Sequence, residues 1–172
     1  MSSAREAFAF PNPVNDYAAR ATAGLVIALA VASIAVNQWW LYAIVALGFA
    51  LRVAGGPKYS PFGRLAVHVI VPRLWRKEKL VPGPPKRFAQ TVGLVFGLVA
   101  TVLSVLGHGL AAEITIGLLV AAAFLEFAFG ICLGCIVFGF LQRHGVIPET
   151  VCEACNNLNL DRGAATLDPA RV

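Results

Sequence analysis

Three long stretches without charge dominate this sequence of 172 residues. Residues 21–51 and 88–112 contain no Asp, Glu, Lys or Arg, and residues 114–141 contain only Glu126. A helix of about 20 apolar residues crosses the roughly 30 Å hydrocarbon core of a bilayer. Only 13% of the residues are charged, against about 25% in ordinary soluble domains. The stretches therefore predict an all-α membrane protein and argue against a soluble protein.

The first stretch is long enough for two helices. Its 31 residues would extend about 46 Å as a single helix, and Asn37-Gln38-Trp39-Trp40 lies near its middle. Tryptophan is enriched at the membrane interface, whereas amide side chains prefer water. We therefore expect a helical hairpin here and, in total, a four-helix transmembrane bundle over residues 20–141. The four helices are predicted near residues 20–36, 39–53, 88–106 and 112–141.

Basic residues concentrate in the loop between the second and third predicted helices. Nine of the 14 Lys and Arg residues lie between Arg52 and Arg87, where Glu78 is the only acidic residue. The positive-inside rule places such a short basic loop in the cytoplasm. The flanking segments, residues 1–19 and 142–172, then lie in the cytoplasm as well. We expect a multi-pass protein of a bacterial inner (plasma) membrane with both termini cytoplasmic.

The same loop contains an apolar run at residues 65–71 that is too short to cross a bilayer. Such a run predicts a short interfacial or re-entrant helix. The net charge of +5 does not indicate nucleic-acid binding, because the basic residues follow the membrane-topology pattern and lack interleaved aromatic residues. The lipid bilayer is the predicted partner of this loop.

All four cysteines fall in two C-x-x-C pairs, Cys132/Cys135 and Cys152/Cys155, with 16 residues between them. This spacing is compatible with a four-thiolate zinc site and equally with thiol exchange. The first pair lies in apolar sequence, where a zinc tetrathiolate of charge −2 would be costly to bury. The second pair lies in polar sequence near a predicted helix start, where the helix dipole lowers the pKa of a thiol.

Three functions therefore remain open from the cysteines. The first is a thiol-disulfide oxidoreductase or sulfur relay that requires no cofactor, in which Cys132 and Cys135 are the buried pair and Cys152 and Cys155 the exchanging pair. The second is a non-enzymatic membrane protein whose four cysteines bind a structural zinc ion. The third is a small membrane scaffold that binds a cytoplasmic partner.

Glu126 is the one ionisable residue within the last apolar stretch. Ionisable residues inside membrane helices are rare and are candidates for function, so we consider a proton-handling role. Because Glu126 precedes Cys135 by nine residues, the two would lie on opposite sides of a straight helix. We expect Glu126 to be protonated or to pair with Arg64, Gln90 or a water molecule.

Four motifs resemble those of the bacterial integral membrane family named domain of unknown function 4395. They are Phe10-Pro-Asn-Pro-Val-Asn15, Ser60-Pro-Phe-Gly-Arg-Leu-Ala66, Pro84-Pro-Lys-Arg-Phe-Ala-Gln90 and Cys132-Leu-Gly-Cys135. The resemblance covers nearly the whole chain and implies an integral membrane fold. It also implies a thioredoxin-like or sulfurtransferase protein as a partner.

Overall fold

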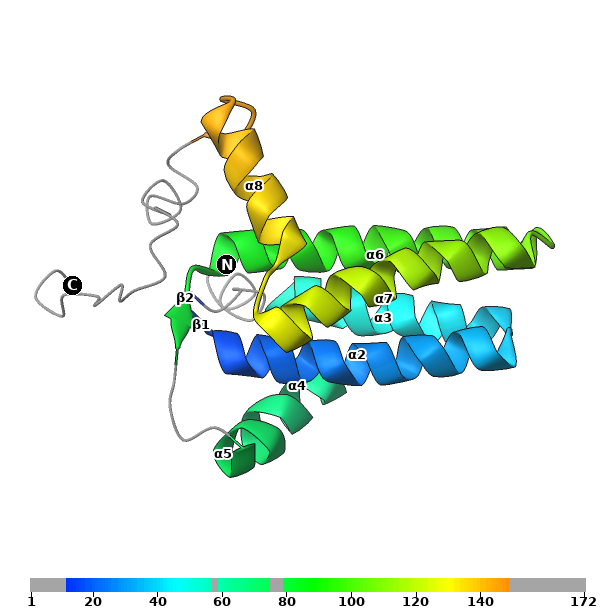
Figure 1. Cartoon of the computed structure of the whole chain (residues 1–172), viewed down its shortest axis with the longest axis horizontal. Helices are drawn as coiled ribbons and strands as arrows, with labels where there is room; N and C mark the ends of the chain where they lie inside the picture. Colours follow the sequence, from blue (N-terminus) through cyan, green and yellow to red (C-terminus); the bar gives the residue numbers. More distant parts are fainter. Residues whose placement is uncertain (1–11, 57–58, 75–78, 149–172) are drawn as a thin grey trace, which may run out of the picture.

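The computed structural model describes residues 12–56, 59–74 and 79–148. Four long helices lie side by side and form the body of the molecule (Figure 1). These are α2 (Asp16–Val36), α3 (Trp39–Gly55), α6 (Gly83–Val105) and α7 (Gly109–Phe129). Helices α2, α6 and α7 are long and apolar enough to cross a membrane, whereas α3 is apolar but has 17 residues. This architecture is consistent with a multi-pass membrane protein.

Two tight turns join the long helices in pairs. The turn between α2 and α3 lies at Asn37-Gln38, where Asn37 adopts the left-handed backbone conformation with φ 49° and accepts a hydrogen bond from the Tyr42 hydroxyl at 3.3 Å. The turn between α6 and α7 contains Gly107 with φ 83°. Left-handed conformations suit Asn and Gly, so both hairpins reverse the chain where the sequence permits it.

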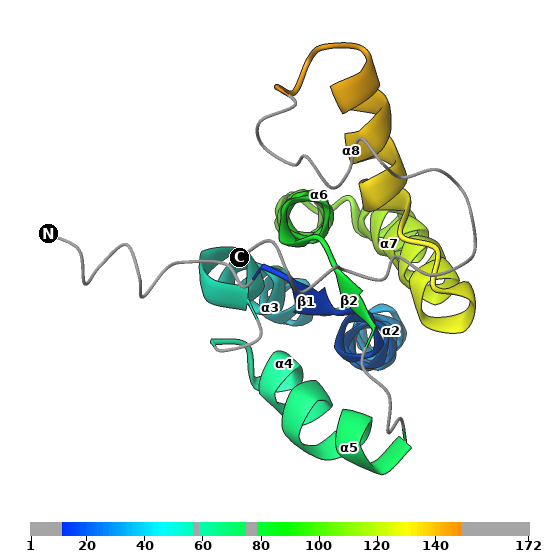
Figure 2. The same ribbon diagram turned by 90° about the vertical axis from the view of Figure 1, so that its left-hand side faces the viewer.

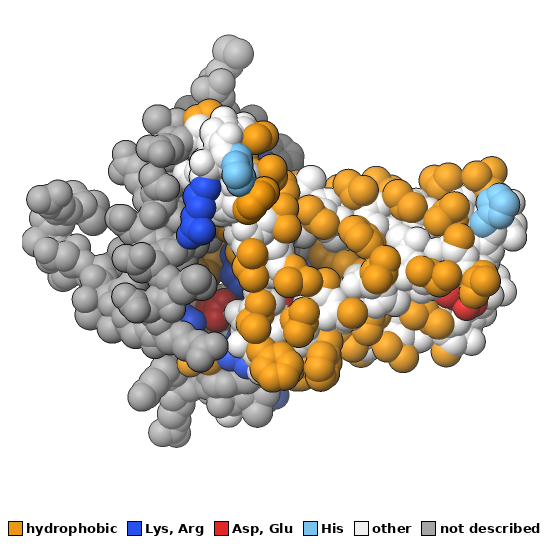
Figure 3. Space-filling model, turned by 45° about the horizontal axis from the view of Figure 1, so that its top comes forward, with side chains coloured by type: hydrophobic (Ala, Val, Ile, Leu, Met, Phe, Trp, Pro, Cys, Tyr) orange, Lys and Arg blue, Asp and Glu red, His pale blue; other side chains and the backbone are white. Residues whose placement is uncertain are grey.

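Close packing of α3 against α6 builds the centre of the bundle. A Cβ atom at Gly97 would lie 2.9 Å from the Cα of Ala46, and one at Gly93 would collide with the Phe49 ring. Small residues allow such close backbone approach between membrane helices. The face of the long-helix bundle seen in Figure 3 is covered largely by apolar side chains and carries little charge, as expected for a surface in contact with lipid.

A sharp break separates α7 from the last helix, α8 (Leu133–Arg143). The single helix expected near residues 112–141 is therefore wrong. Gly130 ends α7 in a left-handed conformation with φ 70°, and α8 leaves the bundle at a steep angle (Figures 1 and 2). Gly134, in the first turn of α8, packs this helix closely against Ala89 of α6.

A second helical segment projects from the same end of the bundle, on the side opposite α8 (Figures 1 and 2). It runs through α4 (Pro61–Leu65), the π-helical turn η2 (Ala66–Ile70) and α5 (Val71–Leu74). Ala66 and Val71 pack against Ala18 and Ala21 of α2. The short helix predicted near residues 65–71 thus begins at Pro61, where Ser60 caps it by accepting a hydrogen bond from the Gly63 amide.

A small β-ribbon ties the starts of α2 and α6 together. Strand β1 (Val14–Asn15) pairs antiparallel with β2 (Leu80–Val81), with Val14 opposite Val81. The Asn12 side chain also accepts a hydrogen bond from the Gly83 amide at 3.0 Å. The ribbon therefore brings the first turns of two helices, far apart in sequence, to one end of the bundle.

Candidate functional site

A buried lysine connects three helices at the ribbon end of the bundle. The Lys86 side chain, in the first turns of α6, is only 6% exposed. Its Nζ donates hydrogen bonds to Asp16 Oδ1 at 3.0 Å and to Glu126 Oε1 at 2.7 Å. The Asp16 and Glu126 side chains are 7% and 18% exposed. Because buried charges require partners, this triad links the starts of α2 and α6 to the end of α7.

The helix dipoles oppose two of these three charges. Lys86 lies near the positive N-terminal end of α6, and Glu126 lies near the negative C-terminal end of α7. Each position is unfavourable for the charge it carries, whereas Asp16 lies at the favourable end of α2. The ion pairs of Lys86 therefore offset the unfavourable interaction of Lys86 and Glu126 with the dipoles of their own helices. Contacts between helices, and not local helix electrostatics, stabilise the three charges.

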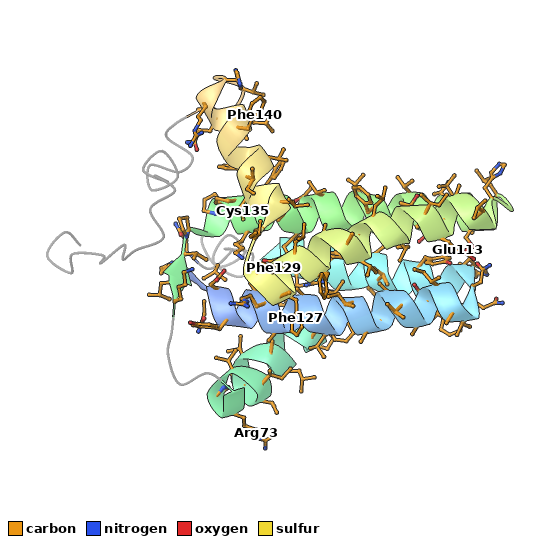
Figure 4. All side chains as sticks on the ribbon, viewed as in Figure 1. Arg73, Glu113, Phe127, Phe129, Cys135 and Phe140 are labelled. Atoms are coloured by element: carbon orange, nitrogen blue, oxygen red, sulfur yellow. The ribbon has the colours of Figure 1, made fainter. Side chains whose placement is uncertain are left out.

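The Cys132–Cys135 pair lies beside this triad, just beyond the last residue of α7. Cys132 is the N-cap residue of α8 and Cys135 lies in its first turn. Both are free thiols and partly buried, and their side chains are hydrogen-bonded to each other. Figure 4 shows Cys135 at the base of α8, near the end of α7 that carries Phe127 and Phe129, and far from Glu113.

The two thiols have different acidities. The hydrogen bond from the Cys135 thiol lowers the pKa of Cys132, and the Lys86 ammonium acts in the same direction. Burial and the Glu126 carboxylate oppose this effect but do not cancel it. The pKa of Cys135 is raised because its thiol is the hydrogen-bond donor and is buried. Cys132 is therefore the thiol that ionises first, at the start of a helix where thiolates are favoured.

Arg20 holds the end of α7 in place, directly before residues 130–135, which form the turn that carries both thiols and are called the cysteine turn below. Its guanidinium donates from Nε and Nη2 to the Phe127 carbonyl at 3.2 and 3.0 Å, and from Nη2 to the Ala128 carbonyl at 3.0 Å. The last carbonyls of a helix lack partners within the helix, and a basic side chain can supply them. Arg20 and Gly130 together determine where Cys132 leaves the bundle.

The environment expected for Glu126 requires correction. Its hydrogen-bond partner is Lys86, rather than Arg64 or Gln90. Arg64 is instead exposed on α4. The opposition of Glu126 and Cys135 was inferred from a straight helix, and the break at Gly130 removes that premise. Glu126 and Lys86 both act electrostatically on Cys135, so the carboxylate belongs to the thiol site.

Sequence reasoning missed Asp16 and Lys86. Asp16 directly follows the motif that ends at Asn15, and Lys86 lies within the motif of residues 84–90. The signal for Lys86 was the basic pair Lys86-Arg87 in the first turns of a helix whose remaining 18 residues carry no charge. A lysine in that position must find a carboxylate on a neighbouring helix or reach the surface.

Cys152 and Cys155 lie outside the described residues. The four-cysteine arrangement, as a relay or as a zinc site, therefore stays a prediction. Within residues 12–56, 59–74 and 79–148, no group of three or more His, Cys, Asp or Glu side chains is arranged to hold a metal ion.

The helices and the site together define a class of protein. It is a helical protein whose described residues include three helices long and apolar enough to cross a membrane, with a C-x-x-C pair beside a buried lysine–carboxylate triad at one end of the bundle. The model of a family described as domain of unknown function (DUF4395) matches residues 14–143, and the chain belongs to this family. The match includes the triad and the first cysteine pair and ends before Cys152. No curated protein and no solved structure matches the chain.

Proposed function

We propose that this protein performs thiol-disulfide or sulfane-sulfur exchange at Cys132 and Cys135. The observation that carries the proposal is the unequal pair at the start of α8, in which Cys135 donates a hydrogen bond to Cys132 and lowers its pKa. Thiolate, and not thiol, is the attacking species in such exchange. Lys86 supports the proposal because a buried cation beside Cys132 favours its thiolate.

The exchange proceeds in two steps. The Cys132 thiolate attacks one sulfur of a substrate disulfide, a mixed disulfide forms, and the other substrate sulfur leaves as a thiolate that takes up a proton. The Cys135 thiol then loses its proton and attacks Cys132 Sγ, which forms the Cys132–Cys135 disulfide and releases the second substrate thiol. With a sulfane-sulfur donor, the first step leaves a persulfide on Cys132, and attack by Cys135 releases hydrosulfide.

Glu126 is the proposed acceptor of the Cys135 proton. It lies close enough to act electrostatically on both thiols, and it is anchored by Lys86 at 2.7 Å. A carboxylate paired with a lysine can accept a proton when the thiol leaves the neutral state. In this role Lys86 positions Glu126 and stabilises charge on Cys132.

The cysteine turn lies at the cytoplasmic surface of the inner (plasma) membrane in this proposal. Helix α8 projects sideways from the end of the bundle (Figure 1) and exposes an apolar face of Leu133, Ile136, Val137 and Phe140. Such a helix fits the boundary between headgroups and acyl chains. Arg64 and Arg73 lie exposed on the segment at the other side of the same end, which the positive-inside rule assigns to the cytoplasm.

Two single-cysteine reporters test this orientation. In a cysteine-free background, we expect Arg73→Cys to react with a membrane-impermeant maleimide only in inverted vesicles. Leu110→Cys, exposed at the opposite end of the bundle, is the matched control and should react only in right-side-out cells. The reverse pattern would overturn the proposed orientation, and labelling of both reporters from one side would overturn the spanning bundle.

Cys152 and Cys155 are proposed to transfer electrons or sulfane sulfur between the Cys132–Cys135 pair and a soluble partner. The cytoplasmic end of the bundle is open to a thioredoxin-like or sulfurtransferase protein, as the family resemblance implies. The first pair alone lies within the family-matched residues, so we assign the core exchange to Cys132 and Cys135.

A trapping experiment tests the exchange itself. With Cys152 and Cys155 replaced by serine, we expect Cys135→Ser protein to retain a glutathione adduct on Cys132 after treatment with glutathione disulfide, because the resolving thiol is absent. The parent should instead lose two protons and carry no adduct, and Cys132→Ser should accumulate little adduct. Intact-protein mass spectrometry measures all three. Equal adducts in the two serine variants would contradict the assigned roles.

A separate preparation that retains all four cysteines distinguishes the zinc alternative. Metal analysis of the full chain, purified without oxygen, should find no stoichiometric metal if the cysteines exchange electrons or sulfur. One zinc per chain that is lost in Cys152→Ser would establish the structural site instead.

A further inference from the structure

A cleft separates the first turns of α6 from the side of α8. It has a volume of about 480 Å³, within the roughly 300–1,000 Å³ typical of ligand sites. Phe88 of α6 and Phe138 of α8 meet edge to face, with ring centres 5.7 Å apart. The lining combines apolar and polar side chains, which are Pro84, Phe88, Phe138, Asn12, Arg87 and Thr91. The cleft is therefore large enough for a short stretch of chain and offers it an aromatic surface.

The charge at this cleft is positive. Arg87 is exposed, and among the described residues no carboxylate lies within ion-pair distance of it. Its neighbour Lys86 is buried and pairs with Asp16 and Glu126 instead. No acidic side chain lines the cleft within the described part of the chain. The positive N-terminal end of the α6 dipole adds to the Arg87 charge, so the cleft favours an acidic occupant over a basic one.

The polypeptide itself returns to this cleft after α8. The helix is followed by Gly145, whose left-handed backbone, with φ 73°, reverses the chain. The Val146 amide donates to the Leu141 carbonyl at 3.0 Å, and the Ile147 side chain packs against Phe138. Because Phe138 lines the cleft, the chain runs back along α8 and reaches the edge of the cleft at Ile147.

The residues that follow carry the charge that this cleft favours. Residues 149–155 have the sequence Glu-Thr-Val-Cys-Glu-Ala-Cys, with two acidic side chains, no basic one and both cysteines of the second pair. Cys152 lies five positions after Ile147, a span of up to about 17 Å when extended. Cys135 lies three positions before Phe138 in α8, about 4.5 Å along the helix axis. A segment that occupies the cleft therefore has the length to bring Cys152 to the first pair.

We propose that residues 149–155 of this chain dock in the cleft between α6 and α8, with Glu153 paired to Arg87. Docking brings the second cysteine pair beside the first, so that the two pairs exchange within one chain. The role of this contact rests on the proposed exchange at the first pair, whereas the docking itself does not.

Docking gives a complete route between the two pairs. The Cys152 thiolate attacks Cys135 Sγ in the Cys132–Cys135 disulfide, and Cys132 leaves as a thiolate that takes up a proton. Cys155 then loses its proton and attacks Cys152 Sγ, which forms the Cys152–Cys155 disulfide and releases Cys135 as a thiolate that takes up a proton. Two electrons and two protons thus move from the second pair to the first, and the reverse sequence returns them.

Cross-linking of the full-length chain tests the docking. In a background that retains only Cys152, the other three cysteines being serine, Thr91→Cys adds a thiol within the cleft. With copper phenanthroline as the oxidant in detergent, we expect this variant to form an intramolecular disulfide on the order of tenfold faster than Arg64→Cys. Arg64 is exposed on α4, at the same end of the bundle but on the side opposite α8 (Figure 1). Peptide mapping by mass spectrometry under non-reducing conditions identifies each disulfide.

A charge exchange tests the proposed ion pair. In the Thr91→Cys chain, Arg87→Glu should slow the cross-link by about threefold or more, because it replaces attraction of Glu153 with repulsion. Adding Glu153→Arg should restore the rate. Arg73→Glu reverses an exposed charge on α5 and is the matched control, which should cross-link at the rate of the Thr91→Cys chain.

Three results would overturn the docking. Equal rates for Thr91→Cys and Arg64→Cys would show that the segment does not occupy the cleft. A rate unchanged by Arg87→Glu would remove the pairing with Glu153, and disulfides between two chains, seen as dimers, would assign the segment to a second copy. The chain in this measurement lacks the first cysteine pair, whereas the glutathione trap uses a chain without the second. Failure of the docking and failure of the exchange are therefore distinguishable.

Discussion

Replacing Lys86 with methionine is expected to lower the free energy of unfolding by about 3 kcal/mol or more. Methionine retains the length of the side chain but removes the ammonium that lies 3.0 Å from Asp16 and 2.7 Å from Glu126. Two largely buried carboxylates then lose their buried counterion. Unfolding in detergent, followed by circular dichroism, measures the loss. We expect no other single substitution in the triad to deprive two charges of a buried partner.

Lys79→Met is the matched control. Lys79 also approaches Asp16, with Nζ 3.8 Å from Oδ2, but its side chain is 66% exposed. Exposed ion pairs contribute little, about 0 to 1 kcal/mol. Adding Asp16→Asn and Glu126→Gln to Lys86→Met should recover part of the stability, since the neutral side chains no longer need a cation. If Lys86→Met were no more destabilising than Lys79→Met, the triad would not hold the helices together.

The second large effect is expected in the reactivity of the two thiols. At neutral pH, Cys132 should be alkylated by iodoacetamide on the order of tenfold or more faster than Cys135, because the pKa of Cys132 is lowered and that of Cys135 is raised. The alkylation rate of Cys132 should rise with pH and level off at a lower pH than for a free cysteine, whose pKa is about 8.5. Peptide mapping by mass spectrometry follows each thiol separately.

Two substitutions of Cys135 separate the causes of this reactivity. Cys135→Ser retains a hydrogen-bond donor, whereas Cys135→Ala removes it. Because hydrogen bonding from Cys135 is the largest influence on the pKa of Cys132, the alanine variant should shift the Cys132 profile to higher pH and the serine variant should shift it less. Identical profiles in the two variants would show that this hydrogen bond does not control Cys132.

Much of the helical architecture could be predicted because it depends on local sequence. Residues 21–51 and 88–112 lack charge, and the amides Asn37 and Gln38 interrupt the first stretch at the turn the structure contains. Both features can be interpreted from the preference of each side chain for water or lipid, without knowledge of contacts distant in sequence. The basic loop likewise indicated a short helix, which the structure begins at Pro61.

The end of α7 could not be predicted in the same way. The apolar run continues through Gly130 and Cys132 without interruption, and glycine is common within membrane helices. What ends the helix is the left-handed backbone of Gly130 together with Arg20, a residue 107 positions away from Phe127, whose carbonyl it binds. A contact of that range has no local signature, so the position of Cys132 at a helix start was not predictable.

The triad escaped prediction for a related reason. Glu126 was recognisable as an unusual residue, but its partner depends on which helix start lies beside the end of α7. That placement is set by the β1–β2 ribbon and by the Asn12 cap on Gly83, which are short pairings without a strong sequence pattern. The sequence therefore identified Glu126 as a candidate but did not identify Lys86 as its partner.

The triad has a consequence for biogenesis. Lys86 joins carboxylates that lie 70 residues before it and 40 residues after it in the chain, so the three charges leave the ribosome well apart in time. Asp16 lacks its buried ammonium partner until α6 has begun to be synthesised, and Lys86 gains its second carboxylate only when α7 is nearly complete. The cysteine turn follows immediately. The two thiols are therefore synthesised after all three charged residues of the triad, so the reactivity of Cys132 depends on correct assembly of the bundle.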